Sequence, residues 1–110
     1  MVPASFDSDW VGNCKNSCLT GNSQIASMLY RLTHVTNNME YKKFADIILS
    51  ATKTTQYTGE GFLDIRGGIP GSYPMSHGYV PNGFPNWAAK FFADALLMKL
   101  GFSKGLDIEA

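Results

Sequence analysis

The chain has 110 residues with nine basic and nine acidic side chains, so its formal net charge is zero. This balance gives no electrostatic attraction to nucleic acid or to an anionic membrane surface, and we predict neither partner. Charged residues make up 16% of the chain, below the roughly 25% of an ordinary globular domain, whereas hydrophobic residues make up 45%. Residues 1–110 are therefore predicted to form one folded domain, part of whose surface meets more protein.

Two cysteines, Cys14 and Cys18, are separated by three residues. This spacing differs from that of most zinc sites and no second Cys/His pair follows, so we predict no metal and no cofactor. A disulfide across a turn is one alternative for this pair, and two free thiols in a reducing compartment is the one we favour. No apolar run approaches the roughly 20 residues of a membrane span. The first residues also lack the pattern of a signal peptide, and we predict a cytoplasmic protein.

Residues 1–19 are predicted to be irregular, because proline, glycine and a run of Asn, Ser and Asp interrupt them. Phe6 and Trp10 are large apolar exceptions in this polar segment. We expect them to dock the segment onto the helices. The functional alternative is that Trp10 lines a ligand pocket beside Asp7 or Asp9.

The first predicted helix spans about residues 22–35, with Thr20 or Asn22 as its N-cap. Its apolar residues recur at helical spacing, and we expect this stripe to face the core: Ile25, Met28, Leu29, Leu32 and Val35. The free N–H groups at a helix N-terminus suit an anion or a carboxylate. Asn22 and Gln24, near this end, are therefore candidate substrate-binding residues; plain capping is the alternative for Asn22.

The second predicted helix follows at once and spans about residues 38–56. Asn37 and Glu40 have the spacing of a capping box. The stripe expected to be buried is Tyr41, Phe44, Ala45, Ile48 and Leu49. Because only a few residues join the two helices, they are predicted to form an antiparallel hairpin.

A long loop, residues 57–86, separates the hairpin from the next helix. Its second half is rich in glycine and proline, too interrupted for a helix and too broken for a strand. Loops of this length in compact domains are usually functional or disordered, and the aromatic and apolar residues here favour order. We therefore expect a structured loop presented by a helical scaffold.

The third predicted helix spans about residues 87–100, with Asn86 as its N-cap and Gly101 as its stop. Lys90 and Asp94 are four residues apart and are expected to pair on its surface. The helix is apolar around much of its circumference: Phe91, Phe92, Leu96, Leu97, Met98 and Leu100. Three helices can make a small bundle, but such a helix fits better in a larger array of helical hairpins.

Three stretches carry a resemblance to a known family: CLTGNSQI (18–25), RGGIPGSYP (66–74) and the segment from PNWAAKFF onward (85–97). In this order they resemble the C-terminal part of bacterial α/α-toroid proteins, described as squalene-cyclase- or prenyltransferase-like and found among polysaccharide-handling proteins. The resemblance covers about residues 10–100. The motifs that true cyclases and prenyltransferases use, acidic DxDD-type or zinc-binding, are absent.

The resemblance implies an all-α fold, in which an antiparallel helical hairpin plus a third helix form a segment of a six-hairpin toroid with a long ordered Gly/Pro-rich loop. It implies a carbohydrate-binding or carbohydrate-active protein, similar to the glycoside hydrolases and lyases that share this architecture. The ligand would be a saccharide or another small molecule. Because residues 1–110 supply only one hairpin and a further helix, we expect either missing N-terminal hairpins or a homo-oligomer.

Loop residues are the candidates for chemistry, since pockets in hairpin arrays lie where helix ends and long connections meet. Asp64 and His77 are candidate catalytic groups, an acid or base in each case. Glycoside hydrolysis needs paired carboxylates, and the available partners of Asp64 are Asp7, Asp9, Glu60 and Asp94. The alternative for His77 is an exposed or hydrogen-bonded loop histidine.

The same loop offers candidate substrate-binding residues. Arg66 could clamp a carboxylate or a pair of sugar hydroxyls; the alternative is an ion pair with Asp64 or Asp94. Tyr73 and Tyr79, together with Phe84 and Trp87, could stack on a sugar ring; the alternative is that they pack the loop onto the helices. Asn86, at a helix N-terminus, completes the set.

A second function class fits the composition as well. Low charge and a third helix that is apolar nearly all round are typical of a non-catalytic helical interaction module that completes a larger assembly. The sequence identifies no reaction.

Overall fold

A computed structural model describes residues 1–104 of the chain. Its elements are β1 (Ser17–Cys18), α1 (Leu19–Thr36), α2 (Met39–Lys53), the 3-10 turn η1 (Leu63–Ile65), β2 (Ser72–Tyr73) and α3 (Asn86–Lys104). The prediction of a mainly helical protein with three helices is confirmed. The two short strands pair antiparallel, Ser17 with Tyr73 and Cys18 with Ser72, so the Gly/Pro-rich loop does contain a strand.

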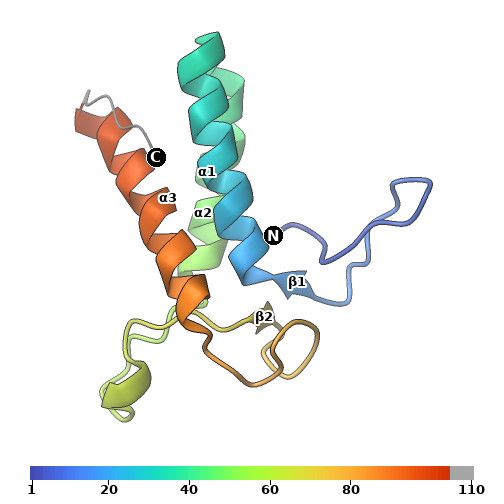
Figure 1. Ribbon diagram of the computed structural model, residues 1–110, viewed down its shortest axis with the longest axis vertical. Coiled ribbons are helices and arrows are strands. Elements are labelled where there is room, and N and C mark those ends of the chain that lie inside the picture. Colours follow the sequence, from blue (N-terminus) through green and yellow to red (C-terminus); the bar gives the residue numbers. More distant parts are fainter. Residues whose placement is uncertain (105–110) are drawn as a thin grey trace.

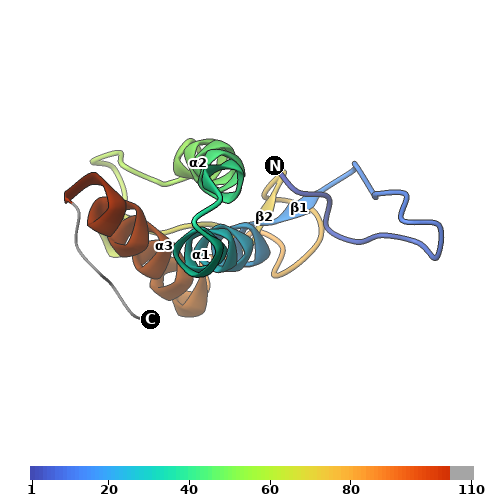
Figure 2. The same cartoon turned by 90° about the horizontal axis from the view of Figure 1, so that it is seen from above.

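Helix α1 lies between the other two helices. It forms an antiparallel hairpin with α2, and α3 packs along another side of it (Figure 1). Seen from above, α2 and α3 sit on different sides of α1 and scarcely contact each other (Figure 2). The protein is a thin slab of 40 × 39 × 18 Å, and each outer helix packs mainly on α1.

The sheet sets the start of α1, which begins at Leu19, earlier than the expected residue 22. The Leu19 N–H donates to the Gly71 carbonyl at 3.1 Å, continuing the strand pairing into the first turn of the helix. Cys18 occupies the N-cap position and makes no side-chain capping bond. The prediction that Asn22 caps the helix is therefore wrong, because the helix begins three residues earlier and the Gly71 carbonyl, rather than a side-chain cap, accepts a hydrogen bond from its first N–H.

The buried face of α1 coincides only in part with the expected apolar stripe, of which Ile25, Leu29 and Leu32 are partly buried. Val35 is 80% exposed and Met28 is 51% exposed. The buried residues of α1 are mostly small or polar: Leu19, Thr20, Asn22, Ser23, Ala26, Tyr30 and Thr33. Closely packed helices favour small side chains between them, and the buried alanines of α2 and α3 have the same character. Apolar spacing identified the helix but not the face that its neighbours cover.

Helix α2 is capped by Asn38, whose side chain accepts a hydrogen bond from the Glu40 N–H at 3.0 Å. Asn37 instead ends α1 in a left-handed conformation and donates to the Thr33 carbonyl, so the predicted capping box is wrong. Helix α2 ends at Lys53. Ala45 and Leu49 are buried as expected, but the prediction that Phe44 is buried with them is wrong, because it lies on the side of α2 that no helix covers and is 54% exposed.

Helix α3 continues through Gly101 to Lys104, so the predicted stop is wrong. The last turn is anchored because the Phe102 ring lies 5.6 Å from that of Tyr30 and stacks on His34 at 4.8 Å. This packing offsets the roughly 1 kcal/mol that glycine costs inside a helix. The expected Lys90–Asp94 pair is confirmed at 2.6 Å.

A polar cluster joins all three helices. The buried Tyr30 hydroxyl of α1 donates to Asp46 Oδ1 of α2 at 2.6 Å, and Lys42 Nζ lies 2.8 Å from Asp46 Oδ2. Lys99 Nζ of α3 lies 3.9 Å from the same carboxylate. Burial raises the pKa of Asp46, but the hydrogen bonds from Lys42 and Tyr30 and the charges of Lys42 and Lys99 outweigh it and leave that pKa below its ordinary value. Burial, and then the bond to Asp46, raise the pKa of Tyr30.

The hydrophobic core follows the α1 contacts and includes Ile69 from the long loop. Its buried apolar members are Leu19, Ala26, Tyr30, Ala45, Leu49, Ile69, Ala88, Phe92, Ala95 and Met98. Among residues 1–104, none of the helices combines the length and apolar character needed to cross a membrane.

Candidate functional site

The segment from residue 70 to 83 folds back on itself and is held by hydrogen bonds. Ser72 Oγ donates to the Tyr79 carbonyl at 2.7 Å, and the Gly71 N–H donates to the Gly83 carbonyl at 3.0 Å. Gly71 is required by this approach, since a Cβ there would lie 2.5 Å from the Tyr79 oxygen. The strand pairing of Ser72 and Tyr73 then places this folded segment beside β1.

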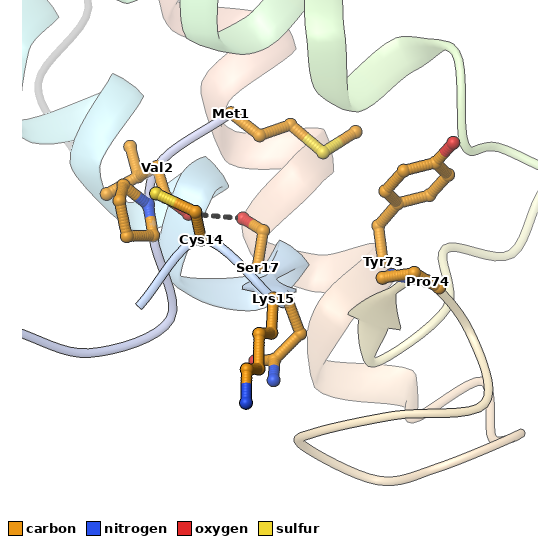
Figure 3. Close-up of a pocket in the computed structure, with 9 residues that line it drawn as sticks. Met1, Val2, Cys14, Lys15, Ser17, Tyr73 and Pro74 are labelled. Atoms are coloured by element: carbon orange, nitrogen blue, oxygen red, sulfur yellow. Dashed lines mark hydrogen bonds between the residues drawn. The ribbon is translucent and has the colours of Figure 1, made fainter. Parts of the chain in front are cut away.

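A cavity of about 350 Å³ lies where β2 meets the N-terminal residues (Figure 3). Its lining residues are Met1, Val2, Pro3, Cys14, Lys15, Asn16, Ser17, Tyr73 and Pro74. Of the residues predicted from sequence to bind or catalyse, Tyr73 alone lines it. This cavity is therefore lined mainly by the first 17 residues, a segment expected from the sequence to be irregular.

The two candidate catalytic residues, Asp64 and His77, are both exposed and neither lines this cavity. Asp64 lies in η1. The His77 N–H donates to the Pro74 carbonyl at 3.1 Å, and its Nδ1 lies 2.9 Å from Ser76 Oγ, as the hydrogen-bonded alternative expects. The structure thus does not bring these two groups to a shared pocket.

Arg66 follows η1 and is exposed. Within residues 1–104 no ion pair joins it to Asp64 or Asp94, and Asp94 pairs with Lys90 instead. The ion-pair alternative for Arg66 is therefore wrong.

Two of the predicted aromatic residues come together. Tyr79 and Trp87 meet edge to face with ring centroids 6.5 Å apart, and each is 44% exposed. Asn86 begins α3 beside Trp87 and is exposed. Tyr73 lies on the cavity instead, so the predicted aromatic platform is divided between two places.

Trp10 is 82% exposed, so the prediction that it docks the N-terminal segment onto the helices is wrong. The cause is a tight turn in which Asp7 Oδ1 accepts hydrogen bonds from the N–H groups of Asp9 and Val11. Trp10 takes a left-handed conformation in this turn and contacts only the ring of Phe6, at 6.2 Å, among the described aromatic rings. It lines none of the described cavities.

Asn22 is 1% exposed and has a different role from the one predicted. Its Oδ1 accepts a hydrogen bond from the Val2 N–H at 3.0 Å, and its Nδ2 donates to Ser17 Oγ at 2.8 Å. Ser17 Oγ donates in turn to the Val2 carbonyl. Gln24, by contrast, is exposed. Ser17 and Val2 had no sequence signal, because a two-residue strand is too short for any alternation to be seen.

Cys14 and Cys18 are both free thiols. Within the described part of the chain, no group of three or more His, Cys, Asp or Glu residues is placed to hold a metal ion.

Comparisons with known proteins found no match among protein families, curated proteins or solved structures.

Proposed function

We propose that this chain is a helical interaction module whose outer faces pack against further helices. The observation that supports the proposal is the thin slab, in which α2 and α3 each contact α1 and leave their other sides uncovered. Large apolar side chains stand on these sides at helical spacing. Exposed apolar faces of this kind mark contact sites in soluble proteins.

The outer face of α2 gives the clearest case. Phe44 and Ile47, three residues apart, are 54% and 56% exposed. On α3, Leu97 and Leu100 repeat the spacing and are also exposed. A cavity of about 320 Å³ between the outer helices is lined by Lys53, Leu96, Lys99 and Leu100. A neighbouring helix would remove these side chains from water. Because the net charge is zero, two copies of the chain would not repel each other electrostatically.

A second copy is the partner available to the isolated chain, so we expect self-association. Sedimentation velocity should show a species heavier than the 12.1 kDa monomer at micromolar concentration. Phe44→Glu should weaken the association by about tenfold or more, because burial of such a side chain is worth about 1.5–3 kcal/mol.

Ser8→Glu is the matched control, since it adds the same charge to an exposed turn away from the helices. It should leave the sedimentation profile unchanged. A 12.1 kDa monomer that persists at high micromolar concentration would remove the basis of the proposal.

The second candidate function is saccharide binding, as part of the toroid-like array that the resemblance implies. The exposed Tyr79–Trp87 pair supports it, because aromatic faces pack on the C–H faces of sugar rings. Asn86 is exposed and adjacent to Trp87 in the chain, so it can add a polar contact, and Arg66 remains a candidate substrate-binding residue. In this proposal Asp64 and His77 remain the candidate catalytic groups. Further hairpins, from more of the chain or from other copies, would complete the pocket.

Tryptophan fluorescence tests this candidate directly, because the chain has two tryptophans. Trp10→Phe leaves Trp87 as the only tryptophan, which can be excited selectively over the tyrosines. Titration of this variant with neutral oligosaccharides and uronates should shift the Trp87 emission, and Tyr79→Ala in the same background should weaken the response several-fold. An emission spectrum that no sugar in the panel changes would count against saccharide binding at this pair.

We also propose a cytoplasmic setting, which the two free thiols support, since disulfides persist mainly in oxidising compartments. Maleimide labelling of Cys14 and Cys18 immediately after cell lysis tests it: blocked thiols would contradict the proposal.

A further inference from the structure

The first four residues form a strap, here called the N-terminal strap, across the start of α1. Both backbone polar groups of Val2 are bound by side chains. Its N–H donates to Asn22 Oδ1 at 3.0 Å, and its carbonyl accepts from Ser17 Oγ. Asn22 Nδ2 donates to Ser17 Oγ at 2.8 Å, so the two side chains act as one unit.

The receiving side chains are buried although the strap is not. Asn22 and Ser17 are 1% and 5% exposed, whereas Met1 and Ala4 are exposed and Val2 and Pro3 are only partly buried. Besides the two bonds at Val2, the backbone of the strap has a bond from the Ala4 N–H to the Asn16 carbonyl at 3.0 Å. A few hydrogen bonds and little apolar burial hold it, so its release costs little compared with the unfolding of a helix.

Cavities lie on both sides of the strap. The 350 Å³ cavity extends from Val2 toward Tyr73 and Pro74, and Figure 3 shows Val2 and Ser17 bonded at its wall. A second cavity of about 190 Å³, on the α1 side, is lined by Val2, Pro3, Ala4, Phe6, Cys18, Gly21, Asn22 and Ile25. The strap therefore fills only part of a larger trough with an amide and a hydroxyl at its floor.

The chemistry of this floor suits an extended peptide. An extended residue presents its N–H and C=O to the same side. The Asn22 amide binds the N–H and the Ser17 hydroxyl binds the C=O, and neither bond depends on the identity of the residue's side chain. Proline after the bound residue disfavours a helical conformation and presets the extended one, as Pro3 does for Val2.

We propose that Ser17, Asn22 and the adjoining cavities form a binding site for an extended apolar segment with an X-Pro step, which the N-terminal strap occupies and which a peptide of the same chemistry can take in its place. The site is independent of the apolar outer faces of α2 and α3. It makes the strap an intramolecular competitor of such a peptide.

The test weakens the strap without altering its site. Val2→Pro in the full chain removes the backbone N–H that donates a hydrogen bond to Asn22 Oδ1, whereas Val2→Ala keeps this N–H. The probe is the peptide Met-Val-Pro-Ala-Ser, amidated and fluorescently labelled at its C-terminal end, with anisotropy as the readout. The V2P protein should bind it about tenfold more tightly than the wild-type chain and the V2A protein, because the competing strap has lost one buried hydrogen bond.

Two further comparisons decide the role of the floor. Asn22→Ala in the V2P background should reduce peptide binding by at least about tenfold, and Ser17→Ala should do the same if the first variant loses its helical circular dichroism. The peptide Met-Pro-Pro-Ala-Ser, which lacks the N–H, should bind about tenfold more weakly than Met-Val-Pro-Ala-Ser. Equal binding by V2P and V2A, retained binding without the Asn22 amide, or no binding to V2P at all would each overturn the proposal.

Discussion

Phe92→Ala should destabilise the protein by about 3–5 kcal/mol, a large share of the roughly 5–15 kcal/mol that keeps a domain folded. Phe92 is 3% exposed in the core between α3 and α1. Several of the buried residues around this interface are alanines, among them Ala88 and Ala95, which cannot extend into the space that the ring leaves. The slab therefore has little means of refilling the cavity. Urea titration followed by circular dichroism at low protein concentration measures the loss as a lower midpoint.

Leu97→Ala is the matched control for Phe92→Ala. It removes a large apolar side chain from the same helix, but Leu97 is 54% exposed. We expect a change of less than about 1 kcal/mol in the monomer, since exposed side chains lose little on truncation. Equal destabilisation by the two variants would show that the outer face of α3 is covered in the monomer, contrary to the structure.

Tyr30→Phe should cost about 1–2 kcal/mol at neutral pH, because it removes a hydrogen bond from a buried hydroxyl to a carboxylate. The lower end of the usual range for such bonds applies, since the Asp46 side chain remains 31% exposed and solvent screens part of the interaction. Lys42 stays bonded to Asp46 in this variant, so the helical hairpin should still form. Thermal unfolding at pH 7 provides the measurement.

The same cluster predicts how stability depends on pH. In the folded protein the pKa of Asp46 lies below its ordinary value of 3.8, so the unfolded chain takes up the proton more readily. The stabilising contribution of Asp46 is therefore complete above pH 3.8 and is lost as the pH falls through that value toward the lower folded pKa.

Asp46→Asn removes this titration and is the control for the acid-dependent loss. It should be less stable than the wild-type chain at pH 7 and should lose less stability on acidification below the ordinary carboxyl range. If both proteins lose the same amount of stability on acidification, the loss comes from carboxylates other than Asp46.

The outer helices show what periodicity can and cannot reveal. The 3.6-residue repeat in the second and third helices is a local property, and it predicted both elements near their observed positions. On α2 it predicted the burial of Ala45 and Leu49 correctly, but Phe44, expected in the same buried stripe, is 54% exposed. On α1, which has neighbours on two sides, the same repeat predicted that Met28 and Val35 are buried, but both are exposed.

The candidate site was harder to predict, because its residues meet only after the chain has folded. The Tyr79–Trp87 pair joins a loop to the first turn of α3, and the Val2–Ser17–Asn22 contacts join three segments without a shared pattern. Asn22 was identified as a binding residue for a reason that proved wrong, its supposed position at a helix end. In the structure Asn22 does bind a segment, but that segment is the N-terminal strap of the same chain.

By itself the sequence determined the three helices, the short hairpin connection and the Lys90–Asp94 pair, since each depends on residues within a few positions of one another. Only the tertiary structure decided where α1 begins, because its first donor bonds to Gly71, and why α3 passes Gly101, because Phe102 packs on Tyr30 and His34. The tertiary structure also decided which faces of α2 and α3 stay exposed. Burial depends on the position of neighbouring elements, and the spacing of residues along a helix carries no information about that position.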